Sequence, residues 1–224
     1  MGAKGSGAVS DFVHAFQFIG NNTSFLWHLT LKTLWLSAAA VRLSSAIAVP
    51  IGVLLGHIHR FSFIAINAAN IGRTLPSLAV LALVMPIMGT GFAPSLFALT
   101  LLALPPILIN THTAIRQVDP DIVDAARGMG MTAFEIVRKV ELPIALPVIF
   151  AGIRTAAVQV VSGAVLAAYI GGGGLGDFIT AGIAMMALPQ LLVGAIPATL
   201  LSLSTDAFFG WIQRALTPSG LRAP

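Results

Sequence analysis

The sequence predicts an all-α membrane protein with five transmembrane helices, and its composition and charge distribution support this fold class. Hydrophobic residues make up 57% of the 224-residue chain and charged residues only 9%, whereas about a quarter of the residues of a typical soluble domain are charged. The apolar residues form runs long enough to cross a hydrocarbon core of roughly 30 Å as helices. The charges concentrate between these runs, above all in one internal segment at about residues 116–143.

Five apolar segments are candidate spans, because a helix needs about 20 predominantly apolar residues to cross a bilayer. The second segment is short unless the half-polar run 62–72 leads into it. The predicted spans are 29–55, 74–88, 95–115, 147–170 and 188–212. Residues 1–28 then form an N-terminal segment, residues 29–213 the transmembrane domain, and residues 214–224 a C-terminal tail.

Basic residues predict the orientation of the chain, since cytoplasmic loops carry an excess of Lys and Arg. Basic residues follow the first, third and fifth predicted spans, whereas the loops 89–94 and 171–187 contain neither Lys nor Arg. We therefore expect the N-terminus outside, and the C-terminal tail and the 116–143 segment in the cytoplasm. His57 and His59 stand beside Arg60 after the first span, and we interpret them as part of a basic interface loop.

The 116–143 segment is predicted to form two short helices that contact a soluble partner. Five of the eight acidic residues of the chain lie there. Asp119 or Asp121 can cap the first helix, because a carboxylate accepts hydrogen bonds from the free N–H groups of a first turn. Small side chains in this helix would allow a close fit to a partner, and the surrounding charges could fix the register.

A spaced motif lies within this segment. Asp124-Ala125-Ala126 is followed after three residues by Gly130, after nine more by Val140, and after one more by Leu142-Pro143. This pattern resembles the EAA loop of the permease subunits of bacterial ABC importers, with Asp124 in place of Glu and Val140 in place of Ile. The resemblance implies the type I ABC importer permease fold, with a coupling helix lodged in a groove of an ATPase subunit. The residues it assigns to coupling are Asp124, Ala125, Ala126, Gly128, Gly130, Val140, Leu142 and Pro143.

Further segments resemble a narrower group, the permeases for quaternary-amine osmoprotectants such as glycine betaine, carnitine, choline or proline betaine. These segments are 73–79, 104–111, 125–131, 152–155 and 170–176. The resemblance implies a subunit of an ATP-driven importer in the bacterial inner membrane, which moves such a solute by alternating access. Methionine, another amino acid or an organosulfonate stays open as the substrate of an ABC importer. An ion-coupled secondary carrier, which needs no ATPase, is the alternative from another class.

The resemblance also implies partners. They are two ATP-binding cassette subunits, a second permease subunit that is identical or related, an extracytoplasmic solute-binding protein and the lipid bilayer. Nucleic acid is not expected. The chain has no Gly-x4-Gly-Lys-[Ser/Thr] phosphate loop, so we expect no enzymatic activity and no cofactor in it, with ATP and Mg used by the partner ATPase.

No catalytic or metal-binding group is expected in this chain. It contains no cysteine, and its five histidines lack the spacing of metal ligands. Gly171, Gly173 and Gly176 fit a G-x-G-x-x-G pattern, but they follow a predicted membrane span rather than a strand. A glycine-rich external turn is the interpretation we favour.

Polar side chains on otherwise apolar helices are candidates for the substrate pathway, because a polar stripe in lipid is costly and should point inward. Thr155, Gln159 and Ser162 recur at four and three residues and so share one helix face. Hydrogen bonding between helices is an equally open interpretation of such residues. The candidates are Thr74, Ser77, Asn110, Thr111, Thr155, Gln159, Ser162 and Tyr169.

Several charges lie within the predicted spans. An arginine at the centre of a span, as expected for Arg42, costs roughly 2.5–3.5 kcal/mol on insertion scales, so it should face protein or water, or snorkel. Arg154 should pair with a carboxylate such as Asp206 or Glu141, or bind lipid phosphate, and spacing does not choose between them. A trimethylammonium group favours an aromatic cage, yet three Trp and one Tyr give no evident one. Solute affinity is therefore expected to reside in the external binding protein.

Overall fold

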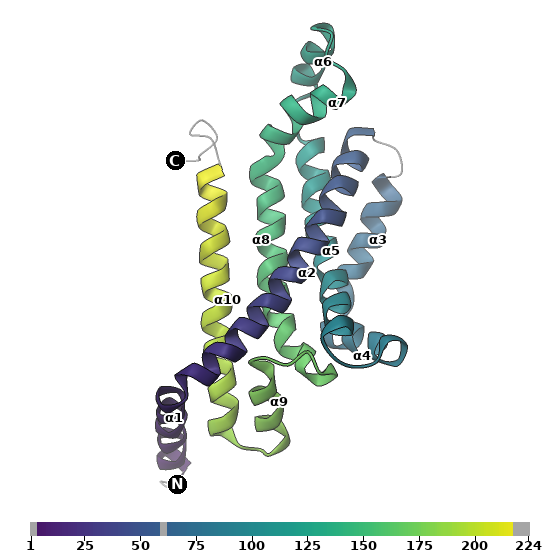
Figure 1. Cartoon of the computed structure of the whole chain (residues 1–224). Helices are drawn as coiled ribbons and strands as arrows, with labels where there is room; N and C mark the ends of the chain where they lie inside the picture. The colour runs from purple at the N-terminus through teal and green to yellow at the C-terminus, as the bar shows by residue number, and fades with distance from the viewer. Residues whose placement is uncertain (1–3, 59–61, 217–224) are drawn as a thin grey trace. The chain divides into compact units, whose positions relative to one another are not determined.

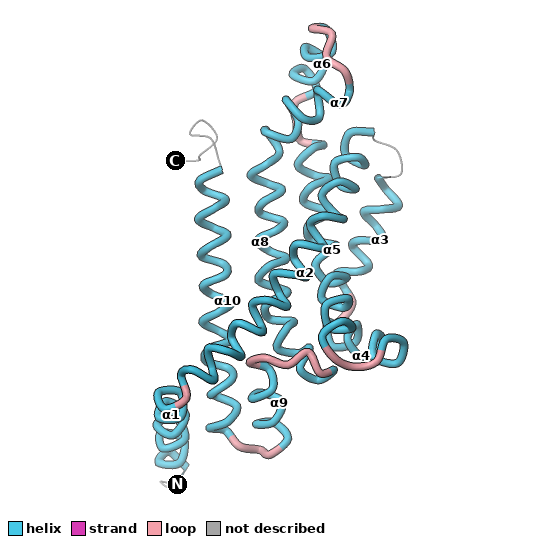
Figure 2. Tube along the Cα trace, in the orientation of Figure 1, coloured by secondary structure: helices cyan, strands magenta, loops and turns pink. Residues whose placement is uncertain are grey.

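The computed structural model describes residues 4–58 and 62–216, and the regular elements within them are helices (Figures 1 and 2). The prediction of an all-α chain is therefore confirmed. In chain order the elements are α1 (Lys4–Asn21), α2 (Thr23–Ile58), α3 (Ser62–Thr74), α4 (Ser77–Met88), α5 (Phe92–Arg116), α6 (Pro120–Gly128), α7 (Ala133–Ile136), the π-helix η1 (Val137–Glu141), α8 (Leu142–Leu166), the 3-10 helix η2 (Ala167–Ile170), α9 (Gly176–Ala184) and α10 (Leu188–Leu216).

Among the described residues, four continuous helical stretches are long and apolar enough to cross a membrane: Thr23–Ile58, Phe92–Arg116, Ala133–Ile170 and Leu188–Leu216. The fifth candidate is the pair α3 and α4, which is interrupted at Leu75 and Pro76. Proline lacks the N–H that a helix needs and disfavours a helical residue before it. The predicted five spans are reached when this interrupted pair counts as one.

The N-terminal part of the chain is helical. The segment 1–28 was expected to precede the first span, and its described residues contain α1 and the first turns of α2. Apolar positions such as Phe12, Phe16 and Ile19 recur along α1 at helical spacing. The expected tail 214–224 is described only as far as Leu216, and His59, Arg60 and residues 217–224 lie outside the described residues.

The chain divides into two units, which we describe separately. Of the described residues, the first unit holds 4–40, 77–99 and 158–205, and the second holds 41–58, 62–76, 100–157 and 206–216. Helices α2, α5, α8 and α10 each contribute residues to both units.

The core of the first unit joins α1 and α2 to α9 and α10. Ala15, Leu26 and Val193 form one buried cluster, and Leu29, Leu175 and Ala198 form another. Partly buried Phe178 packs against both clusters. Its ring also meets Phe18 and Phe25 edge-to-face, at centroid distances of 5.9 and 6.0 Å.

The glycine-rich segment before α9 lies against the first turns of α2 in this unit. Gly174 has a φ of +93°, and a β-carbon there would collide with the Thr33 hydroxyl. The backbone N–H of Leu175 donates a hydrogen bond to Thr33 Oγ1 at 3.0 Å. The glycines therefore serve a left-handed backbone and a close approach to a helix, which agrees with a turn rather than a dinucleotide site.

The second unit is held together by close contacts to α5. Gly52 and Gly56 of α2 lie so near to it that added β-carbons would stand 2.7 Å from the β-carbons of Thr111 and Ile115. A β-carbon added at Gly152 of α8 would likewise stand 2.6 Å from the β-carbon of Asn110. Lipid tails are as apolar as the helix side chains, so the hydrophobic effect does not drive helices together in a membrane. Helices associate there through close packing, which small residues permit because they let the backbones approach.

Candidate functional site

The segment between α5 and α8 carries the spaced motif, and its first helix begins at a side-chain cap. The Asp119 carboxylate accepts a hydrogen bond from the backbone N–H of Asp121 at 2.9 Å, and Pro120 occupies the first helical position. Of the two residues expected as the cap, Asp119 and Asp121, it is Asp119 that caps the helix. Helix α6 ends at Gly128, and Gly130 follows with a φ of +82°. Glycine adopts this left-handed conformation without steric cost.

The second helix is started by a capping box. The Thr132 side chain accepts from the Glu135 backbone N–H, and the Glu135 carboxylate accepts from the Thr132 backbone N–H at 3.0 Å. Lys139 Nζ lies 2.9 Å from Glu135 Oε1. The hydrogen bond from Lys139, followed by those from Thr132, lowers the pKa of Glu135 to about 2. The segment therefore has a defined conformation set by its own sequence.

The motif residues divide into exposed and anchoring positions. Asp124, Ala125, Gly128, Gly130 and Pro143 are exposed, whereas Ala126 is buried and Val140 and Leu142 are half-buried. Leu142 packs against a buried cluster of α5 and α8, formed by Ala114, Ile115, Ala145 and Ile149.

Large apolar side chains accompany the exposed positions. Met129 and Phe134 are each 72% exposed, and Ile122 is 46% exposed. In Figure 1 α6 and α7 lie beyond the end of α8, within the same unit. Apolar side chains beside small and charged residues make this segment suited to contact another protein.

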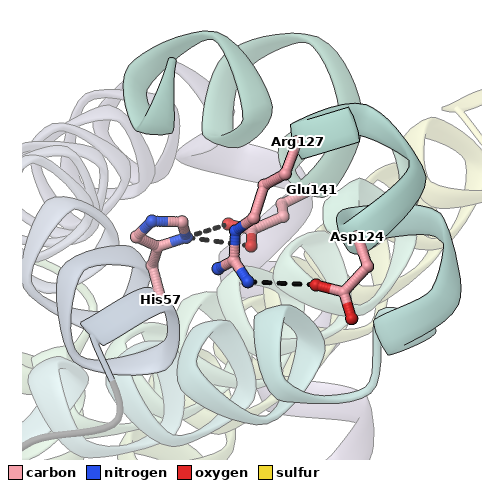
Figure 3. A network of polar contacts seen from close by, with 4 residues as sticks. All are labelled: His57, Asp124, Arg127 and Glu141. Carbon is pink, nitrogen blue, oxygen red and sulfur yellow. Dashed lines mark hydrogen bonds and ion pairs between the residues drawn. The ribbon is translucent and has the colours of Figure 1, made fainter. Parts of the chain in front are cut away.

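A hydrogen-bonding contact between a histidine and a buried glutamate joins the base of this segment to α2. Glu141 ends η1 and its side chain is only 6% exposed, and His57 Nδ1 lies 2.9 Å from both of its carboxylate oxygens (Figure 3). The expectation of a basic interface loop at His57 is wrong, because His57 lies in the last turn of α2 and faces Glu141. The sequence did not reveal this pair, since its members stand 84 residues apart.

A cavity of about 240 Å³ adjoins the pair. It is lined by parts of α2, α5, α6 and η1. Figure 3 shows Arg127 of α6 extending from its own helix on the side where His57 and Glu141 meet, with Arg127 Nη1 3.0 Å from Asp124 Oδ1. The charged or titratable residues that line the cavity are His57, Arg116, Asp124, Arg127 and Glu141.

The candidate pathway residues differ in their exposure and belong to both units. Thr155, Gln159, Ser162 and Tyr169 are exposed, the first three along one face of α8. Asn110 Nδ2 donates to the Pro106 carbonyl within α5 at 2.7 Å. Thr111 is fully buried, Thr74 is exposed at the end of α3, and Ser77 is half-buried at the start of α4.

The open question of the partner of Arg154 has an answer within the second unit. Its Nε and Nη2 atoms each donate to one carboxylate oxygen of Asp206 at 2.7 Å, so the pair is bidentate. Gly210 leaves room for the guanidinium, because a β-carbon there would lie 3.1 Å from Arg154 Cζ. Glu141 pairs with His57 instead. Arg42 is exposed on α2.

Comparisons with known proteins agree with this arrangement. The family described as the binding-protein-dependent transport system inner membrane component matches residues 48–219. The choline transport system permease protein OpuBB of Bacillus subtilis (strain 168) is 41% identical over 209 residues, which cover 93% of this chain and 96% of that protein. The glycine betaine/carnitine/choline transport system permease protein OpuCB of the same organism is 40% identical, covering 92% and 94%.

A solved structure extends the likeness to the fold. A chain of the MetNI methionine ABC transporter in an inward-facing conformation matches with a TM-score of 0.74 and 25% identity, covering 86% of this chain and 96% of that one. This likeness confirms the predicted fold class.

Proposed function

Since this chain belongs to the family of inner membrane components of binding-protein-dependent transport systems, we propose that it is the transmembrane subunit of an ATP-driven importer for a quaternary-amine osmoprotectant. The observation that carries the solute class is the identity of 40–41% with choline and glycine betaine/carnitine/choline permeases over more than nine-tenths of the chain. Choline, glycine betaine, carnitine and proline betaine share a bulky cationic ammonium group, which defines the class.

The exposed segment of α6 and α7 docks on an ATPase subunit in this proposal. Its caps hold it in one conformation before binding, which reduces the entropy lost on docking. Met129 and Phe134 supply apolar contact, and the small residues Ala125, Gly128 and Gly130 allow close approach. ATP and Mg then act in the partner, and this chain performs no covalent chemistry.

A second permease subunit, identical or related, covers the polar face of α8. Thr155, Gln159 and Ser162 are exposed in the single chain although they lie on an apolar helix. A polar face in lipid is unfavourable, whereas the same face beside a second subunit can line a water-filled path. The solute path therefore runs beside α8, and alternating access follows from rigid-body movement of the paired subunits.

The orientation follows from the basic residues. The 116–143 segment and the tail from residue 214 lie in the cytoplasm, and residues 1–28 lie on the outside. Residues 29–213 form the transmembrane domain, which lies in the inner membrane. An extracytoplasmic binding protein delivers the solute and supplies its selectivity.

Reconstitution tests this proposal. Proteoliposomes with the chain, its ATPase and its binding protein should accumulate labelled choline, glycine betaine or carnitine when ATP is hydrolysed, and unlabelled quaternary amines should compete. Competition by methionine but by none of the quaternary amines would contradict the solute class. Uptake by the purified chain alone under an ion gradient would favour the secondary carrier.

A further inference from the structure

The pair of His57 and Glu141 has no assigned role, and its environment is unusual for an acidic side chain. Glu141 is a buried carboxylate, and charged groups are rarely buried without a partner. Its two oxygens, Oε1 and Oε2, each lie 2.9 Å from His57 Nδ1, which is hydrogen-bond distance. We call this contact the His57–Glu141 bridge.

The backbone that carries Glu141 is also irregular. Residues Val137–Glu141 form a π-helix between α7 and α8. A π-turn inserts one residue into an α-helix and rotates the side chains that follow, and such turns are frequent at functional sites. The helical stretch Ala133–Ile170 is continuous through this turn, so a displacement of α7 passes along the backbone into α8.

The bridge adds a second connection, which leads to α2. His57 stands at the end of α2, one residue after Gly56, and Gly56 and Gly52 lie against Ile115 and Thr111 of α5. This close packing makes the ends of α2 and α5 move together. A force on the segment at α6 and α7 thus reaches α5 and α8 through the backbone, and it reaches α2 through the bridge.

The remaining surroundings leave room for movement. Parts of α2, α5 and α6 line the cavity beside the bridge, and Arg116, Asp124 and Arg127 line it with the bridge. On this side, the polar contact of His57 and Glu141 borders open space.

We infer that His57 and Glu141 are positioning residues, which transmit movement of the α6–α7 segment to α2 and so keep ATP hydrolysis coupled to transport. This inference rests on the proposed function, in which the segment docks on an ATPase. It assigns to two residues a task that the spaced motif does not describe, since neither belongs to the motif residues.

The experiment measures the number of solute molecules imported per ATP hydrolysed, in proteoliposomes with the complete complex. His57→Ala and Glu141→Ala should each reduce this ratio on the order of tenfold, because removing either member breaks the bridge between α2 and η1. The double variant should fall no further than either single one, since residues that act as a pair are not additive. The exchanged variant, His57→Glu with Glu141→His, should restore part of the ratio.

A control lies outside the docking segment. Thr199→Val removes an exposed hydroxyl that is bonded to Ala195 within α10, and it should leave the ratio unchanged. Glu141→Gln keeps the size of the side chain and one hydrogen bond to His57, and it should give an intermediate ratio. This variant replaces Glu141→Ala if that variant does not assemble into the complex. A ratio that stays at the wild-type value while both rates fall together would overturn the inference, as would independent effects of the two residues. Failure of the wild-type complex to import would instead contradict the proposed function.

Discussion

At the scale of single residues, the segment of α6 and α7 contains one glycine in a backbone conformation that favours glycine. Gly130 combines a φ of +82° with open space around the place of a β-carbon. The space shows that no neighbour among the described residues requires glycine, so the requirement lies in the backbone conformation. Gly128 is also exposed and open but lies in the helical region.

The first prediction concerns Gly130→Asp. A β-carbon in the left-handed conformation costs roughly 1–2 kcal/mol, and the carboxylate obstructs close docking. Transport and solute-stimulated ATP hydrolysis should therefore fall by about tenfold or more, since 1.4 kcal/mol corresponds to tenfold. Membrane insertion should be unchanged when it is measured by fractionation. Gly20→Asp, at an open position of α1, is the control, and unchanged coupled ATPase activity in Gly130→Asp would contradict the assignment of the segment.

At the scale of helices, glycine spacing decides how closely two elements pack. Gly52 and Gly56 are four residues apart on α2 and face Thr111 and Ile115, which are four residues apart on α5. This small-x-x-x-small arrangement brings the two backbones together over one helical turn. The candidate pathway residue Thr111 is therefore fully buried where α5 lies against α2.

The second prediction is that Gly52→Ala destabilises the chain. The new methyl group would stand 2.7 Å from Thr111 Cβ, and overpacking of this kind costs about 1–3 kcal/mol. Thermal unfolding of the purified protein in detergent measures the change. Gly20→Ala, where nothing lies within 4 Å, should not lower the midpoint, because alanine is the better helix former. Equal midpoints for the two variants would show that α2 and α5 are not held by this contact.

At the scale of the whole molecule, one face of α8 is left uncovered by the part of the chain that the structure describes. Thr155, Gln159 and Ser162 lie along it and are exposed. An importer with a path between two subunits needs such a face on each subunit, whereas a helix with lipid on all sides does not tolerate it.

The third prediction follows from this face. Gln159→Leu should lower solute uptake roughly tenfold, the effect of about 1.4 kcal/mol, while ATP hydrolysis without solute is retained. The measurement compares uptake with basal ATPase activity in the same proteoliposomes. Thr199→Val on α10 removes an exposed hydroxyl that is bonded within its own helix, and it should have little effect. Wild-type uptake by Gln159→Leu would exclude this face from the path.

The sequence predicts the features that depend on local patterns. Apolar run length predicts the spans, and the spacing from Asp124 to Pro143 predicts the segment that α6, α7 and η1 form. Asp119 was one of two expected caps, because capping depends on neighbours along the chain.

Features that depend on distant residues could not be derived in this way. Arg154 had two carboxylates as possible partners, and only the packing of α8 and α10 selects Asp206. His57 was misread because charge patterns do not show which side of a helix end faces the protein. The π-turn at Val137–Glu141 has no sequence signal, and it determines where Glu141 points.

The hydrogen bond from Leu175 to Thr33 has a consequence for biogenesis. Its two residues are separated by 142 positions, and at roughly 5–20 residues per second the ribosome needs on the order of ten seconds to synthesise the stretch between them. During that interval α2 has left the ribosome without the hydrogen bond that Thr33 later accepts from Leu175. The nascent chain thus completes this part of the first unit only after the glycine turn has been synthesised, so the packing of the turn against α2 is a late step of folding.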